Sequence, residues 1–138
     1  MKRVFADTSY WIAHLNPADS LHPAARQAAR AHAASIVVTS EMGLTEVLNA
    51  FSDAGPERRA AAVRLVHSLR STPGYEIVSQ SGAWFEKALA LYAARTDKAW
   101  GLTDCSSFAI MRDMAICEAL AADADFQQAG FRALLREP

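Results

Sequence analysis

The chain has 138 residues, 51% of them apolar and 21% charged, which excludes an intrinsically disordered protein and predicts one compact domain over residues 1–138. Its formal net charge of −1 lacks the basic surplus typical of nucleic-acid-binding proteins. Any contact with RNA or DNA would therefore have to use local patches or a metal ion.

The N-terminal segment does not have the pattern of a secretory signal. Residues 1–3 are basic, but Asp7 interrupts the apolar run that follows them. The longest apolar helical stretch, residues 83–94, carries charges and is too short to cross a bilayer. Cys105 and Cys117 lack metal-ligand spacing, and we expect reduced thiols packed in the fold. These features predict a cytoplasmic protein without membrane contact.

The first half of the chain alternates short apolar stretches with helical ones. In chain order, we expect a strand at 4–6, helices over 9–15 and 21–34, a strand at 35–39, and helices over 40–53 and 57–71. Thr39 or Ser40 is expected to cap the helix over 40–53. The inward stripe of that helix is predicted to be Leu44, Val47, Leu48 and Phe51.

The second half continues the same alternation. We expect a strand at 75–78, helices over 84–95 and 103–114, a strand at 116–121, a helical turn at 126–129 and a final edge strand at 131–135. Thr103 is expected to cap its helix, and the alternating pattern at 75–78 indicates a strand near a sheet edge. The whole pattern predicts an α/β protein, a three-layer α/β/α sandwich around a short, mainly parallel central sheet.

Three aspartates stand where an open α/β fold keeps its functional site. Asp7 and Asp123 each follow a predicted strand, and the carboxyl ends of parallel strands share one sheet edge. Asp104 lies in the first turn of a helix and leans toward the side of Phe108 and Met111, a costly place for a charge. Taken singly, Asp104 also fits an ordinary acid in the first turn of a helix, and Asp7 and Asp123 each fit a helix cap or an Asx-turn.

Convergence of these acids would require a cation. Two carboxylates 4 Å apart repel by about 4 kcal/mol at an effective dielectric constant of 20, and unpaired acids would hold protons instead. Asp7, Asp104 and Asp123 have no lysine or arginine beside them in sequence. A set of oxygen ligands suits Mg²⁺ or Mn²⁺ and argues against zinc.

Two further carboxylates have open roles on pattern alone. Glu46 projects away from the apolar stripe of its helix, and Glu41 is an equal alternative. Asp125 either joins the acids or caps the turn that begins at Phe126. Nucleophilic catalysis is disfavoured, because the sequence has no G-x-S-x-G elbow and no glycine-rich phosphate loop.

Four segments together resemble PIN-domain ribonucleases of the VapC toxin type. They are FADTS, TEVLN, WGLTDC and ADADFQQAGF, at residues 5–9, 45–49, 100–105 and 122–131. Their order and spacing both agree with that family, and the resemblance covers essentially the whole chain. It implies an α/β/α sandwich whose acids hold Mg²⁺ or Mn²⁺, with endonucleolytic cleavage of RNA as the activity.

The resemblance also assigns roles by position. It implies that the catalytic and metal-binding acids are Asp7, Glu46, Asp104 and Asp123, which favours Glu46 over Glu41. Ser9 would support the first acid, and Asp125 falls where the family carries a histidine or an acid. The loop before Asp104 sometimes contributes another aspartate, but here only Asp97 is near. The implied partners are an RNA substrate, a cognate antitoxin protein that blocks the acidic cleft, and a second copy of the chain in a homodimer.

Two competing interpretations remain at this stage. A phosphatase with an aspartyl nucleophile needs a second aspartate two residues after Asp7, where Ser9 stands. A PIN-like module that only binds RNA or a protein is the other, although each expected acid is present.

Overall fold

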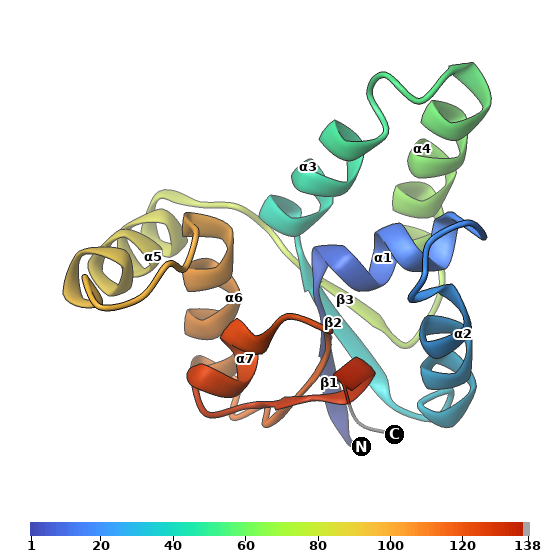
Figure 1. The fold of residues 1–138 in the computed structure, drawn as a ribbon. Helices are drawn as coiled ribbons and strands as arrows, with labels where there is room; N and C mark the ends of the chain where they lie inside the picture. The colour runs from blue at the N-terminus through green and yellow to red at the C-terminus, as the bar shows by residue number, and fades with distance from the viewer. Residues whose placement is uncertain (137–138) are drawn as a thin grey trace.

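A computed structural model describes residues 1–136, and in this range five strands form one parallel sheet covered by helices on both faces (Figure 1). The spatial order of the strands is β3-β2-β1-β4-β5, and every pair is parallel. The strands are β1 (Arg3–Ala6), β2 (Ile36–Ser40), β3 (Tyr75–Val78), β4 (Glu118–Leu120) and β5 (Arg132–Ala133). The predicted edge position of the third strand is confirmed.

The helices separate into two layers. Their bounds are α1 (Thr8–Leu15), α2 (His22–Ala31), α3 (Glu41–Ala50), α4 (Pro56–Ser71), α5 (Gly82–Ala94), α6 (Leu102–Asp113) and α7 (Ala124–Gln128). Figure 1 shows α1, α2 and α4 on one side of the sheet and α5, α6 and α7 on the other. The predicted α/β/α sandwich is confirmed. No helix within residues 1–136 is long and apolar enough to span a membrane.

Alternation along the central strands builds the two halves of the core. Val4 belongs to the apolar cluster under α1, α2 and α4, whereas its neighbour Phe5 belongs to the cluster under α5, α6 and α7. Val37 and Val38 of β2 divide in the same way. Since successive side chains of a strand point to opposite faces, a run of apolar residues can serve both layers at once. The sheet is therefore buried on both sides.

Some element ends differ from the expectation. Helix α2 ends at Ala31 and not at residue 34, and β5 covers only Arg132–Ala133 before a 3₁₀ turn at Leu134–Arg136. The amide of Leu135 still donates to the carbonyl of Ala121, so the 3₁₀ turn stays tied to the segment after β4 in the register of the ladder. Local pattern does not reveal such tertiary hydrogen bonds.

Two predictions about burial are wrong. Leu48 was expected on the inward stripe of α3 but is 39% exposed, while Leu44 and Val47 are buried. Helix α3 is contacted by α1, α4, α6 and β2, and Leu48 lies outside the part of its circumference that these elements cover. Cys117 is exposed and not packed, whereas Cys105 is buried, and both are free thiols as expected.

Candidate active site

The central strands bring two of the acids to neighbouring positions. Strands β1 and β4 pair directly, and the amide of Asp7 donates to the carbonyl of Leu120 at 3.1 Å. Asp7 then caps α1, and Asp123, three residues beyond the end of β4, caps α7. Asp7 and Asp123 thus each cap a helix, as a single acid in such a position often does, and both also lie at the carboxyl edge of the sheet.

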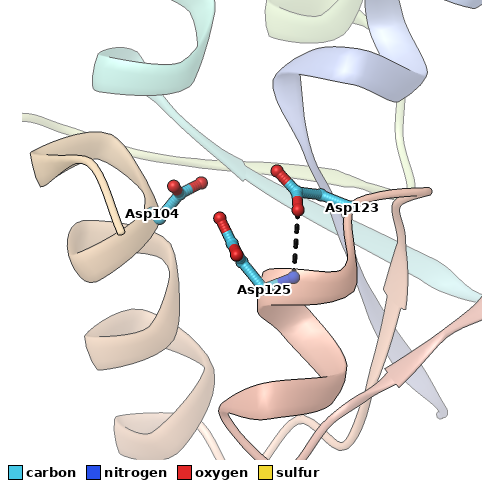
Figure 2. A group of neighbouring side chains, drawn as sticks. All are labelled: Asp104, Asp123 and Asp125. Carbon is cyan, nitrogen blue, oxygen red and sulfur yellow. Dashed lines mark hydrogen bonds between the residues drawn. The ribbon is translucent and has the colours of Figure 1, made fainter. Parts of the chain in front are cut away.

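Three carboxylates converge at this edge. One oxygen each of Asp104, Asp123 and Asp125 lies within 4.8 Å of the others. Figure 2 shows Asp104 on α6 facing Asp125 at the start of α7, with Asp123 in the segment before α7. An oxygen of Asp123 accepts the Asp125 amide at 3.0 Å, so Asp123 and not Asp125 caps this helix. The side chain of Asp125 is therefore left to face Asp104.

The first turn of α6 holds Asp104 in place. Helix α6 starts at Leu102 with Gly101 as its N-cap, so the expectation that Thr103 caps it is wrong. The Asp104 carboxylate itself accepts the Gly101 amide at 3.1 Å. This bond satisfies one of the free amides of the helix terminus, which is why the helix can begin before Thr103.

Asp7 is buried at the same edge of the sheet. Its side chain is 8% exposed and accepts the hydroxyl of Ser9 at 2.8 Å. Burial raises the pKa of Asp7, with a smaller contribution from the charge of Glu46, while the Ser9 hydroxyl and nearby amides lower it. The charge of Asp7 also acts on Asp104. Asp7 is thus electrically coupled to the convergent group, although it is not one of its three members.

Glu46 and Glu41 separate clearly in space. Glu46 is exposed, and its Oε1 accepts the hydroxyl of Thr8 at 2.9 Å, beside Asp7. Glu41 turns the other way and accepts the amide of Gln80 at 2.7 Å. Thr8 was not singled out in the sequence. Its position between Asp7 and Ser9 was the available signal, because a hydroxyl at the start of a helix can reach a neighbouring element.

Burial and crowding change the protonation of the centre. The pKa of Asp104 is raised to about 7, mainly by burial and also by the charges of Asp7, Asp123 and Asp125, while the hydrogen bond from the Gly101 amide opposes the rise. The pKa of Asp125 is also raised by burial and by Asp123. Carboxyl groups in such a position hold a proton near neutral pH unless a cation balances them.

The donor set fits a hard divalent cation. The three convergent groups are all carboxylates, and oxygen ligands suit Mg²⁺ or Mn²⁺ better than the nitrogen and sulfur ligands typical of zinc. Asp97 does not join them, because Arg95 donates to both of its carboxylate oxygens at 3.0 Å and holds its pKa at about 2. The acids of the centre therefore come from the first turn of α6 and from the N-cap and first turn of α7.

Comparison with known proteins gives a consistent result. The profile described as PIN domain matches residues 4–132. The chain is 29% identical over 128 residues to the 23S rRNA-specific endonuclease VapC20 of Mycobacterium tuberculosis, in its strains CDC 1551 and H37Rv, covering 93% of this chain and 95% of the relative. The crystal structure of VapC20 from that organism, described as a sarcin-ricin loop cleaving toxin, superposes with a TM-score of 0.83 at 28% identity, covering 94% of this chain and 97% of that one.

Proposed function

The chain belongs to the PIN domain family, and from this premise we propose that it is a metal-dependent endoribonuclease, the toxin of a toxin-antitoxin pair. The observation that carries the proposal is the convergence of Asp104, Asp123 and Asp125 within 4.8 Å at the carboxyl edge of the sheet. The family match over residues 4–132 includes Asp7, Glu46, Asp104, Asp123 and Asp125, and the likeness to an rRNA-specific endonuclease extends over 93% of the chain.

The proposal assigns a role to each acid. Asp104, Asp123 and Asp125 would hold Mg²⁺ or Mn²⁺, because their oxygens are already close enough to share an ion. Asp7, coupled to Asp104, would add its charge to the group. Glu46, beside Asp7, would face the side from which a substrate phosphate approaches.

The hydroxyl residues have positioning roles in this proposal. Ser9 fixes the carboxylate of Asp7 at 2.8 Å, and Thr8 fixes that of Glu46 at 2.9 Å. The chemistry that a bound ion supplies is activation of water and neutralisation of charge on the phosphate. The residues of the chain orient the acids and partly shield them from bulk water, and the bound ion would keep them ionised.

The proposed partners follow from the same family membership. The substrate class is RNA, and the relative named as a sarcin-ricin loop cleaving toxin suggests structured ribosomal RNA as the first substrate to test. A cognate antitoxin that covers the acidic edge, and a homodimer in solution, complete the proposal. A phosphatase is disfavoured, since Ser9 occupies the position where an acid would be needed and is engaged with Asp7.

The decisive experiment is cleavage of RNA by the purified protein, free of any antitoxin. With Mn²⁺ or Mg²⁺ present, we expect cleavage of 23S rRNA or of a sarcin-ricin loop oligonucleotide, with 5′-phosphate and 3′-hydroxyl product ends. Asp7→Asn and Asp104→Asn are expected to lose at least about 100-fold in kcat/KM, since each removes a charge from the centre.

Asp113→Asn is the matched control. Asp113 lies at the other end of α6 from Asp104 and pairs at 3.6 Å with Lys87 on the surface. Its substitution should leave cleavage within about two-fold of the parent. Binding of RNA without any cleavage, or equal cleavage by Asp104→Asn, would contradict the proposed function.

A further inference from the structure

A cavity beside the acid centre has walls of a different character. It has a volume of about 370 Å³ and lies where α5 ends, the next loop crosses and α6 begins. Its lining includes Tyr92, Arg95, Thr96, Lys98, Trp100 and Cys105. We call it the loop cavity. Pockets that bind small organic groups span about 300–1,000 Å³, so the loop cavity can take one nucleotide.

The loop cavity adjoins the acid centre through two connections. Trp100 donates its indole N–H to Gln128 at 3.2 Å, which ties one wall to α7, the helix that carries Asp125. Cys105 lines the cavity and directly follows Asp104 in α6. Figure 2 shows these two helices facing each other across the acids. A group in the loop cavity would therefore be a near neighbour of a phosphate held at the centre.

One wall of the cavity is preorganised. Trp100 is 4% exposed and packs edge-on against Phe108, with ring centroids 4.9 Å apart. The guanidinium of Arg95 lies 5.0 Å from the centroid of the Trp100 ring and is held in place by its two hydrogen bonds to Asp97. A planar cation fixed in this way loses little freedom when a flat ligand stacks on it.

Two other residues that line the loop cavity, Tyr92 and Lys98, are more exposed than Trp100. Tyr92 is 52% exposed, although most aromatic rings of this chain are covered. Lys98 lies close enough to Asp125 for its charge to lower the pKa of that acid. An exposed ring, a fixed guanidinium and a nearby ammonium are the groups that bind unpaired nucleotides, through base stacking and phosphate contact.

We propose that the loop cavity is a substrate subsite that binds one unpaired base of the RNA, next to the phosphate that is cleaved. This inference rests on the proposed function and deepens it. The base stacks on Tyr92 and Arg95, and Lys98 contacts the adjoining backbone phosphate. The subsite makes cleavage depend on a base that is out of the helix, and it ties specificity to the segment between α5 and α6.

The test measures binding and cleavage separately. A fluorescein-labelled sarcin-ricin loop oligonucleotide, whose fold fixes its register on the protein, is titrated into the protein in EDTA at low ionic strength, so that binding is read without cleavage. A series of the same RNA carries one abasic nucleotide, moved stepwise along the strand. For the parent protein, we expect one position at which the missing base weakens binding by about 5- to 100-fold, the range of one base-aromatic stack.

Variants of Tyr92 test whether its ring binds the base. Tyr92→Ala should weaken binding of the intact RNA by a similar factor and flatten the abasic series, because the base has then lost its ring. Tyr92→Phe keeps the ring and should restore both. Leu89→Ala is the matched control, since Leu89 is an exposed apolar residue, 42% exposed, on the same helix but outside the cavity lining. It should behave as the parent.

The outcomes separate this inference from the proposed function. If the parent cleaves RNA with Mn²⁺ and Tyr92→Ala does so with unchanged KM and an unchanged abasic series, the subsite is wrong and the nuclease stands. A shift in molar mass of Tyr92→Ala by light scattering, with the abasic series intact, would assign the ring to a contact between two copies and also overturn the subsite. Base-dependent binding lost in Tyr92→Ala, in a parent that does not cleave, would support the subsite and contradict the nuclease.

Discussion

At the scale of single residues, Asp104 is where stability and the proposed chemistry conflict. Its carboxyl group is partly buried, faces Asp123 and Asp125, and has a pKa raised to about 7. An acid whose folded-state pKa lies above its unfolded value contributes stability below the unfolded pKa, and that stability is lost as pH rises through the folded pKa. Without a cation, the ionised Asp104 therefore destabilises the fold above about pH 7.

Asp104→Asn is thus expected to stabilise the metal-free protein while removing its activity. The amide keeps an oxygen for the Gly101 amide but carries no charge. The rise in Tm should be full above about pH 7, where the parent is ionised, and should shrink to nothing near the unfolded value of 3.8. Thermal melts in EDTA from pH 4 to about 8 measure this, with Asp113→Asn as the control. A lower Tm for Asp104→Asn than for the parent at pH 8 would show that the ionised Asp104 does not destabilise the metal-free fold.

At the scale of elements, the joints between strands and helices position the acids. Ser40 ends β2 and caps α3 at once, and its buried hydroxyl accepts the Gly43 amide at 3.0 Å. Helix α3 then carries Glu46 toward Thr8, whose hydroxyl also reaches the Gly43 carbonyl at 3.3 Å. The short joint leaves little freedom in the direction of α3, so the cap contributes to the position of Glu46.

Ser40→Ala should therefore cost more than loss of an exposed cap. Ser40 is 2% exposed, so water cannot easily replace its bond, and we expect the free energy of unfolding to fall by about 1–2 kcal/mol. Ser81 caps α5 with the same kind of bond, to the Trp84 amide at 3.2 Å, but is exposed. Ser81→Ala should cost about 0.5 kcal/mol. Urea unfolding compares the two, and an equal or reversed order would show that burial of the Ser40 cap is unimportant.

At the scale of the whole molecule, the two apolar clusters support one charged edge. Residues Phe5 and Val4 anchor β1 in opposite clusters, so the strand that delivers Asp7 is fixed from both faces. The net charge is only −1, but the charges are unevenly distributed, because three carboxylates converge at the sheet edge. A divalent cation bound there would stabilise the folded chain as a whole, since the unfolded chain does not bring these acids together.

Mn²⁺ is accordingly expected to raise the Tm of the intact protein. At a concentration of about 100 times its Kd, an ion that binds only the folded state adds about 2.7 kcal/mol, or several degrees in Tm. The rise should be larger at pH 8 than at pH 6, because Asp104, with its pKa of about 7, must lose a proton for the ion to bind. Differential scanning calorimetry with and without Mn²⁺ measures both, and NaCl of equal ionic strength is the control. A Tm that ignores millimolar Mn²⁺ would favour a module that only binds its partner.

Much of this molecule follows from local sequence. Buried strands ending in acids predicted that Asp7 and Asp123 share a sheet edge, and their strands are direct neighbours. The α/β alternation predicted the sandwich, because periodicity and turn residues are local properties that report which face of an element is apolar. The resemblance of the four sequence segments added the family and the choice of Glu46 over Glu41, which pattern alone left open.

The tertiary structure decided how far apart side chains from different elements lie. It brought Asp125 into the convergent group, gave its capping role to Asp123, and replaced Thr103 by Gly101 as the N-cap of α6. It also paired Glu46 with Thr8. A sequence pattern states which way a side chain leaves its own helix or strand. The distance between two such side chains depends on how the elements pack, and at this edge that packing determines which carboxylates can share an ion.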